Sequence, residues 1–511
     1  MYSCVKSYGI NGIDAYAVTV ETTLSRSIPS FDVVGLPDAA VKESRSRVQS
    51  ALVHAGYELP VAKITVNLAP ASQKKSGPAF DLPIFLAVML ASQQLEALPE
   101  KSAFVGELGL SGQLRPINGV LSMAIQAKAD GILRLYVPQA NAKEASIVDG
   151  LEVYPVSDIE QLCRCLCGQQ EIAPLPFDPM LLLDGGNRFT EDLCEVRGQG
   201  FAKRALEIAA AGGHNLLLIG PPGTGKSMLA KRLPTILPKL SFEEAIQTTR
   251  IYSVAGMLPP DHPIMNTRPF RSPHHTVSPA GLTGGGSSPV PGEISLAHNG
   301  VLFLDELPEF QRQSLEVLRQ PIEDSCVTIS RAASRVTYPC SMMFVAAMNP
   351  CPCGYRGHPS IACTCSENAV QRYISKISGP LLDRIDLHVE VAPVQFHDLT
   401  GSSTEESSAV VRARVEKARK LQQERFAGEP FHCNARIPAG KLQQYCPLSG
   451  EALEFLRRSF ESLGMTARAY DRVVKVARTI ADLAGEETIG RTQIAEALAY
   501  RTLDQKYWYE N

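Results

Sequence analysis

One stretch of the chain has the residue types and spacing that the phosphates of a nucleotide require. Positions 220–227 read GPPGTGKS, which is the pattern G-x-x-x-x-G-K-[ST]. Its glycines let backbone N–H groups approach phosphate oxygens, Lys226 would reach the β- and γ-phosphates, and Ser227 would hold Mg²⁺. The sequence therefore predicts a site for ATP and Mg²⁺. The residues expected to contact the nucleotide are Gly220, Pro221, Pro222, Gly223, Thr224, Gly225, Lys226, Ser227 and Met228.

Polar side chains follow two further apolar runs that are typical of buried strands. Residues 301–304 form one run, and Asp305 and Glu306 come directly after it. Because chemistry is expected at the carboxyl ends of parallel strands, we predict that Asp305 joins the Mg²⁺ shell and that Glu306 orients and deprotonates the attacking water. Residues 342–348 form the second run and end at Asn349, whose amide could position the same water or sense the γ-phosphate. An ordinary acidic turn and a strand-capping asparagine are the alternatives.

Four cysteines lie within 15 residues shortly after Asn349, in the order C-x-C, nine residues, C-x-C. Four thiolates at this spacing could close a tetrahedral Zn²⁺ site, although C-x-C is tighter than the usual C-x₂-C knuckle. Free thiols are the alternative, and His358 is a substitute ligand. A bound metal would brace the loop that leaves Asn349. The candidate zinc ligands are Cys351, Cys353, Cys363 and Cys365.

Length and composition limit the class of protein. A chain of 511 residues should form about three domains, and 44% hydrophobic with 20% charged residues is ordinary for a globular protein. No apolar run approaches the ~20 residues that span a bilayer, and the N-terminus lacks a basic segment followed by an apolar one. We therefore expect a cytoplasmic protein with no membrane partner. The net charge of −3 would confine any DNA contact to local loops or to the inner surface of a ring.

These residues must be positioned by a mixed α/β architecture. Alternating strand-like and helix-like runs predict a compact α/β domain over residues 1–168, and a Pro-rich stretch predicts a linker over residues 169–189. Residues 190–395 should form a doubly wound nucleotide-binding domain, and residues 396–511 a helical lid. The strands expected most clearly are 15–20, 63–68 and 215–219; the helices are 38–56, 81–95, 228–233, 410–426, 450–463 and 467–484.

The placing of Asn349 after a buried strand resembles the first sensor of the AAA+ ATPases. The segment LLDRID around Arg384 resembles their arginine finger, which reaches the nucleotide of a neighbouring subunit and therefore implies a ring. A surface pair between Arg384 and Asp386 is the alternative. Arg468 matches the second sensor of the lid, and Arg372 is a less specific candidate for contact with nucleotide. Each could also be a solvated charge on a helix.

The interval between Lys226 and Asp305 is long and contains residues 268–300, a block rich in glycine and proline. This block resembles the helix-2 insertion of the magnesium-chelatase-like AAA+ group. With NGVLFLDELPEF and GPLLDRIDLHVE, the chain most closely resembles the ComM/YifB family of competence proteins, from end to end. The resemblance implies a P-loop AAA+ core, a lid of the magnesium-chelatase C-terminal type, and a homo-hexamer formed or stabilised by ATP and DNA. It also implies an ATP-driven motor for branch migration of single-stranded or branched DNA.

Two basic features could meet DNA. Residues 327–338 predict a hairpin with Arg331 and Arg335 near its tip, and both could contact phosphates in the pore of a ring. An exposed hairpin with solvated arginines is the alternative. Adjacent histidines at 274 and 275 should point to opposite faces of an extended segment, which disfavours a metal site and favours contact with DNA or a neighbouring subunit.

The N-terminal domain resembles the proteolytic domain of Lon, with a fold of the ribosomal S5 domain 2 type. The resemblance rests on KKSGPAF, residues 74–80, and on VGELGLSGQLRPINGVL, residues 105–121. Lon-type enzymes use a Ser-Lys dyad, and the two corresponding positions here are Ala79 and Leu121. Because neither side chain can act as nucleophile or base, we predict that the domain does not cut peptides. A metal-chelatase-type motor subunit or a protein-remodelling ATPase remains the alternative function.

Overall fold

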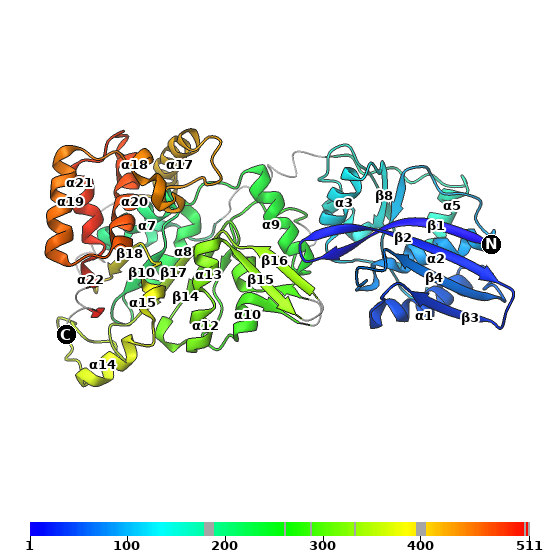
Figure 1. The fold of residues 1–511 in the computed structure, drawn as a ribbon, viewed down its shortest axis with the longest axis horizontal. Helices are drawn as coiled ribbons and strands as arrows, with labels where there is room; N and C mark the ends of the chain where they lie inside the picture. The colour runs from blue at the N-terminus through cyan, green and yellow to red at the C-terminus, as the bar shows by residue number, and fades with distance from the viewer. Residues whose placement is uncertain are drawn as a thin grey trace.

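The computed structural model describes residues 1–177, 189–259, 262–286, 289–331, 334–394, 405–504 and 507–508. Most of the predicted linker, residues 178–188, and the predicted boundary at 395–396 lie outside these ranges. The chain is elongated, with the N-terminal region at one end, the nucleotide-binding region in the middle and the helical C-terminal region at the other end (Figure 1). Within the described ranges, no helix combines the length and the apolar character needed to cross a bilayer.

The N-terminal region is built from three sheets and the helices beside them. A four-stranded sheet has the order β1-β2-β4-β3, a parallel sheet has the order β5-β8-β9, and β6 pairs with β7. The elements are β1 (Tyr2–Asn11), β2 (Asp14–Ser25), β3 (Ser30–Val34), α1 (Ala39–His54), β4 (Lys63–Ala69), α2 (Asp81–Ala91), β5 (Ser102–Phe104), β6 (Glu107–Leu108), β7 (Leu114–Arg115), α3 (Val120–Ala129), β8 (Arg134–Pro138), α4 (Ala142–Ala145), β9 (Glu152–Val156) and α5 (Ile159–Leu166).

Local chemistry explains where the helices of this region begin and end. The Asp38 side chain accepts a hydrogen bond from the Val41 amide at 2.9 Å and so caps α1, which begins one residue after the predicted start at residue 38. Helix α2 ends at Ala91, four residues before the predicted end. The reason is local, since Gln93 adopts a left-handed φ of 61°, which does not continue a helix.

The central region is a five-stranded parallel sheet of order β11-β14-β17-β10-β18. Two hairpins, β12-β13 and β15-β16, stand outside it. The elements are α7 (Gly200–Gly212), β10 (Leu216–Ile219), α8 (Lys226–Ile236), α9 (Phe242–Val254), β11 (Phe270–Arg271), α10 (Pro279–Thr283), β12 (Gly284–Gly285), β13 (Val290–Pro291), α11 (Glu293–Leu296), β14 (Val301–Leu304), α12 (Arg312–Glu316), α13 (Arg319–Asp324), β15 (Cys326–Arg331), β16 (Ser334–Pro339), β17 (Met343–Met348), α14 (Glu367–Ile374), α15 (Gly379–Leu382) and β18 (Leu387–Glu390).

Both faces of this sheet are covered, which is why its strands read as continuous apolar runs. Along β10, Leu216 and Leu218 face one hydrophobic cluster that includes helices α7, α8, α17 and α20. Leu217 and Ile219 face a second cluster on the other side, which includes residues of α9, the β15-β16 hairpin and α14. Successive side chains of a strand point to opposite faces of the sheet, so the apolar residues of this one strand are shared between two hydrophobic cores.

The C-terminal region is helical, as the sequence predicts. It comprises α17 (Ser408–Arg425), α18 (Leu442–Tyr445), α19 (Gly450–Leu463), α20 (Ala467–Ala484), α21 (Arg491–Ala499) and α22 (Thr502–Asp504). Helices α17 and α20 pack against α7 at the end of the molecule opposite the N-terminal region (Figure 1). This lid thus shares one hydrophobic cluster with the sheet that carries the phosphate-binding loop.

The N-terminal region contacts the central region through hydrogen bonds and an ion pair. Glu144 is almost fully buried and accepts hydrogen bonds from the Leu121 amide at 2.9 Å and from the Ser253 hydroxyl of helix α9. Burial raises the pKa of the Glu144 carboxyl. Arg250, also on α9, forms an ion pair of 2.7 Å with Asp14. Helix α9 therefore joins the two regions.

Candidate nucleotide site

The predicted catalytic residues lie at one edge of the central sheet. Strand β10 pairs with β17 so that Ile219 lies opposite Met348, and β14 pairs with β17 so that Leu304 lies opposite Ala346. Because all three strands are parallel, their carboxyl ends meet at the same edge. The phosphate-binding loop, the two carboxylates and Asn349 follow these ends directly.

The phosphate-binding loop adopts backbone conformations that its glycines make accessible. Gly223 and Gly225 have φ values of 76° and 86°, in the left-handed region that other residues avoid. A Cβ atom at Gly220 would lie 2.3 Å from the carbonyl oxygen of Val391. Helix α8 begins at Lys226, so its N-terminal N–H groups face the loop as an anion site requires.

Lys226 is held across the loop by oxygen atoms. Its Nζ donates to the carbonyl oxygens of Gly220 and Pro221, both at 2.7 Å, and to Oδ1 of Asn349 at 3.2 Å. Burial lowers the pKa of Lys226 to about 8, against the opposing effect of the carboxylates of Asp305 and Glu306. A buried ammonium whose hydrogen-bond acceptors are neutral oxygens keeps its charge available to a phosphate.

Ser227 and Asp305 lie side by side, as two ligands of one Mg²⁺ should. The Ser227 hydroxyl donates to Oδ2 of Asp305 at 2.5 Å, although the two residues are far apart in sequence. A hydroxyl and a carboxylate are the hard oxygen donors that Mg²⁺ takes beside substrate phosphates. The residues present therefore fit this ion.

The side chain of Glu306 is more than half exposed. Its backbone is in the left-handed region with φ of 53°, and its amide donates to Oδ1 of Asp305 at 3.0 Å. Its Oε2 lies 3.8 Å from Nδ1 of His275, a neighbour that the sequence did not predict. The rings of His274 and His275 lie 4.0 Å apart, because this segment turns and is not extended, so their expected separation onto opposite faces is wrong.

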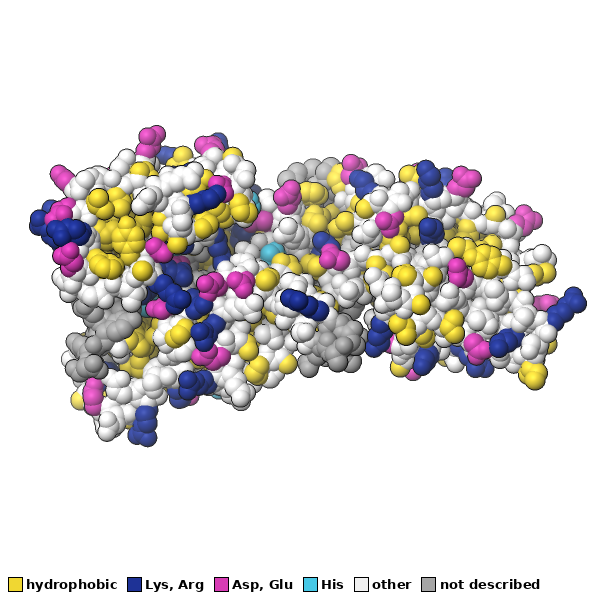
Figure 2. All heavy atoms as spheres, in the orientation of Figure 1, with side chains coloured by type: hydrophobic (Ala, Val, Ile, Leu, Met, Phe, Trp, Pro, Cys, Tyr) yellow, Lys and Arg dark blue, Asp and Glu magenta, His cyan; other side chains and the backbone are white. Residues whose placement is uncertain are grey.

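Arg384 and Arg468 lie together, and neither contacts its own phosphate-binding loop among the described residues. Arg384 donates to Pro380 O at 2.6 Å and pairs with Glu323, while Arg468 lies 3.5 Å from Asp383. Both line a cavity of about 210 Å³ where the lid meets the central region. Figure 2 shows Lys and Arg side chains gathered beside acidic ones at this junction. The other candidate, Arg372, is exposed on α14, with its Nε donating to a backbone carbonyl of its own helix.

The predicted alternative partner of Arg384 is engaged elsewhere. Asp386 is buried and accepts from Arg472 of helix α20 at 2.5 Å, from the Asn215 amide at 3.0 Å and from His214 at 3.3 Å. These neighbours hold the pKa of Asp386 well below its usual range, in spite of burial. The surface pair between Arg384 and Asp386 is therefore wrong, and Asp386 instead ties the lid to the sheet.

The chain is similar to known proteins over nearly its whole length. Residues 20–141 match the family described as subunit ChlI of Mg-chelatase, residues 192–399 match magnesium chelatase, subunit ChlI, and residues 405–501 match its C-terminal family. The chain is 44% identical to competence protein ComM of Haemophilus influenzae over 96% of each sequence. It is 42% identical to protein YifB of Escherichia coli over 98% of this chain and 97% of that protein. The chain belongs to the ComM/YifB family of magnesium-chelatase-like proteins.

The four cysteines that this family member carries after Asn349 come together. Their Sγ atoms all lie within 4.8 Å of one another. His358 is not in this group, because its Nδ1 accepts hydrogen bonds from the Ser360 and Ile361 amides at 3.1 and 3.0 Å within its own loop. The structure thus gathers the predicted cysteine ligands and leaves the substitute ligand apart.

The hairpin predicted for DNA forms, and it lies against the N-terminal region of this ComM/YifB protein. Strands β15 and β16 pair from Cys326–Pro339 to Arg331–Ser334, while residues 332–333 and the side chain of Arg331 lie outside the described part. Val336 packs in one cluster with Ile13. The exposed side chain of Arg335 lines a cavity of about 660 Å³ between the two regions.

The two positions of the expected protease dyad lie in the N-terminal region, and Ala79 lines this cavity. Ala79 and Leu121 are buried in the same hydrophobic cluster. Ser76 and Lys75, at a different place in the sequence, are the residue types of such a dyad, but Lys75 is buried and donates to the carbonyl oxygens of Pro70 and Gln73. Within the described ranges, no hydrogen bond joins Lys75 to Ser76.

Proposed function

We propose that this protein is an AAA+ ATPase that works as a hexameric motor on branched DNA. The observation that carries the ATPase proposal is the meeting of Lys226, Ser227, Asp305 and Asn349 at one edge of a parallel sheet. Lys226 and the loop amides bind the phosphates of ATP, and Ser227 with Asp305 holds Mg²⁺, which neutralises charge on the phosphates when bound. We propose that the protein works in the cytoplasm.

Hydrolysis requires a group that directs water at the γ-phosphate, and we assign this role to Glu306. Its side chain is more than half exposed, and its backbone amide donates to Oδ1 of Asp305 at 3.0 Å. Glu306 accepts the proton of the attacking water, and Asn349 orients the same water or senses the γ-phosphate. His275, 3.8 Å from Glu306, positions the carboxylate.

Two arginines that make no contact with their own phosphate-binding loop among the described residues support the proposed ring. Arg384 and Arg468 line one cavity where the lid meets the central region, and we assign both to the nucleotide of a neighbouring subunit. Arg384 leaves Glu323 to do so, and that pair is weak because the Glu323 side chain is 61% exposed. Each nucleotide site is then complete only between two subunits, which makes oligomerisation by ATP a direct consequence.

The DNA substrate is inferred from kinship and local charge. A near full-length relative is named a competence protein, and we take the uptake and recombination of DNA strands as the setting for this chain. Because net charge is negative, the contacts with DNA phosphates fall to local groups such as Arg331 and Arg335. ATP turnover moves these groups along a strand and promotes branch migration.

The N-terminal region takes a Lon-like fold without proteolysis. The positions that resemble the Lon dyad hold the buried, unreactive side chains of Ala79 and Leu121. This region serves ring assembly or contact with DNA. Peptide or casein cleavage by the purified protein, lost on Ser76→Ala, would contradict it.

A second candidate is a metal-chelatase-type motor, because the three family matches describe chelatase subunit ChlI. That function would show ATP turnover that responds to a protein or metal-insertion partner and not to DNA. The same response to protein alone would indicate a remodelling ATPase.

The deciding experiment measures ATP hydrolysis and strand movement on a synthetic three-strand or four-way junction. We expect DNA to stimulate hydrolysis. We also expect branch migration to convert the junction into separate duplex products. Glu306→Gln should bind ATP and abolish both activities, because an amide cannot take a proton from water. Glu309→Gln is the matched control, since Glu309 is three residues away and partly exposed, in a pair with Lys376. No DNA stimulation and no strand movement in the parent protein would exclude the motor.

A further inference from the structure

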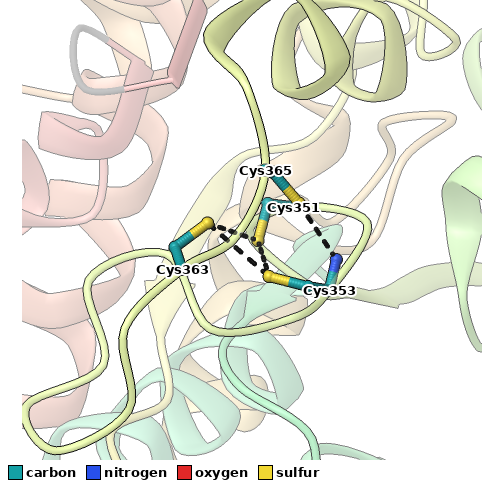
Figure 3. A group of neighbouring side chains, drawn as sticks. All are labelled: Cys351, Cys353, Cys363 and Cys365. Atoms are coloured by element: carbon teal, nitrogen blue, oxygen red, sulfur yellow. Dashed lines mark hydrogen bonds between the residues drawn. The ribbon is translucent and has the colours of Figure 1, made fainter.

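The cysteine group has the geometry of a metal site. The Sγ atom of Cys351 lies 3.4 Å from that of Cys353 and 3.6 Å from that of Cys363, and Cys353 and Cys363 are also 3.6 Å apart. Cys365 completes the group within 4.8 Å. The four side chains converge from two separate parts of one loop (Figure 3). Among the described residues, this is the one cluster of three or more His, Cys, Asp or Glu ligand atoms.

These separations match a single tetrahedral ion. Zinc–thiolate bonds of about 2.3 Å place the sulfur atoms of a tetrahedron about 3.8 Å apart, close to the observed values. The same separations are far longer than the ~2.05 Å of a disulfide bond. The chain has thirteen cysteines, so this convergence is specific to four of them.

Backbone amides already point at the sulfur atoms. The Cys353 amide donates to Sγ of Cys365 at 3.4 Å, and the Arg356 amide donates to Sγ of Cys351 at 3.3 Å. Such N–H···S bonds orient metal-bound thiolates and spread their negative charge. Cys351 is fully buried, so the group is anchored in the hydrophobic cluster beneath the sheet edge.

The loop that carries the cysteines also touches the nucleotide site. Gly354, with φ of 85°, packs so closely on the phosphate-binding loop that a Cβ there would lie 2.6 Å from Cδ of Pro222. Asn349, the partner of Lys226, precedes Cys351 by two residues. The position of the cysteines therefore constrains both the phosphate-binding loop and Asn349.

We propose that Cys351, Cys353, Cys363 and Cys365 bind one Zn²⁺ and that this ion holds Asn349 and Gly354 against the phosphate-binding loop, so that nucleotide affinity depends on the metal. Zinc binding displaces the thiol protons to solvent and exchanges no electrons. The metal site stands on the cysteine geometry alone, whereas its effect on ATP rests on the proposed nucleotide site.

The metal is tested without ATP or DNA. We expect elemental analysis of the full-length protein, purified without chelator, to give one zinc per chain. Co²⁺ added to the metal-free protein should give the visible absorption of a tetrahedral thiolate centre. The double variant Cys363→Ser, Cys365→Ser should lose both signals, and Cys165→Ser, a partly buried thiol outside the cluster, should keep them. Absence of bound metal and of the cobalt spectrum in the parent, or iron in place of zinc, would overturn the assignment.

The coupling is tested by binding of a fluorescent ATP analogue before and after removal of zinc. We expect affinity to fall about fivefold or more, within the usual range for two coupled sites, and to return when zinc is restored. Circular dichroism before and after removal shows whether the chain stays folded, and restoration by zinc separates reversible coupling from loss of fold. Unchanged nucleotide affinity in a zinc-depleted, folded protein would overturn the coupling. A protein that binds zinc but no nucleotide would contradict the proposed ATPase and leave the metal assignment standing.

Discussion

The Nζ atom of Lys226 lies 3.2 Å from Oδ1 of Asn349, so the phosphate-binding loop and the end of the neighbouring strand β17 are joined by their side chains. The contact spans 123 positions of sequence. It exists because β10 and β17 pair in parallel and end at the same edge of the sheet. A phosphate bound to Lys226 would therefore also lie close to the Asn349 side chain.

Nucleotide affinity should fall as pH rises above about 8. Burial lowers the pKa of Lys226 to about 8, whereas anionic phosphate favours its charged form. Binding must then take up a proton above this pH, and affinity should weaken by up to about tenfold for each further pH unit. Calorimetry in buffers of different ionisation heat would measure the uptake. Lys226→Arg, whose guanidinium stays charged, should bind with no such pH dependence.

His275 should matter more for turnover than its neighbour His274. Only His275 approaches Glu306, at 3.8 Å, while Nδ1 of His274 lies 3.0 Å from the Thr276 hydroxyl. We expect His275→Ala to lower kcat about tenfold with little change in KM, less than the ~100-fold cost of a 1 Å misplacement of a catalytic group. His274→Ala is the matched control. Equal effects of the two substitutions, or a change confined to KM, would exclude the positioning role.

Mixed rings should recover activity if Arg384 acts on a neighbouring subunit. Glu306→Gln and Arg384→Ala proteins should each be inactive alone. In an equal mixture, some sites combine an intact Glu306 with an intact Arg384 from the adjacent subunit, and about a quarter of sites should do so in a random heterologous ring. Recovered hydrolysis would be measured against mixing ratio. An inactive mixture, in subunits shown to associate, would place Arg384 outside the neighbouring site.

The buried contact between Asp386 and Arg472 should stabilise the attachment of the lid. Asp386→Ala leaves the largely buried Arg472 without its partner and should cost about 3–5 kcal/mol of unfolding free energy. Arg468→Ala breaks the exposed contact with Asp383 and should cost at most about 1 kcal/mol. The unfolding free energies of the two variants would be compared by denaturant titration, with fluorescence or circular dichroism as the signal. Equal costs would contradict the assigned burial of charge.

The same contact predicts a loss of stability in acid. The pKa of Asp386 is depressed in the folded protein, so its contribution is complete above the unfolded value of about 3.9 and is lost as pH falls below it. The difference in stability between the parent and Asp386→Ala should therefore shrink below about pH 4. A difference independent of pH would show that charge is not its source.

Local signals account for much of what the sequence predicted correctly. Helices α19 and α20 have the predicted bounds because each begins after a capping side chain, Ser449 or Thr466, and ends at a glycine in the left-handed conformation. Helix α8 begins at Lys226, two residues before the predicted start at residue 228, and directly follows Gly225 in the left-handed conformation. Such features depend on neighbours a few residues away, which the sequence displays directly.

The partners of long side chains were decided by the tertiary structure. His275 meets Glu306, Arg472 takes Asp386, and Arg468 lies beside Asp383 in the cavity that it shares with Arg384. A charged side chain can satisfy itself with any nearby opposite charge, and which one is nearby depends on how distant elements pack.

The sequence by itself therefore determined the chemistry of this protein: a loop for phosphate, carboxylates after a strand and four thiols at close spacing. Their backbone requirements are local and specific, so the residue types suffice to predict them. The tertiary structure alone decided how these groups are connected. Parallel strands bring Lys226 to Asn349, and the cysteine loop packs on Pro222, because burial of apolar faces sets the distances between segments that the sequence keeps far apart.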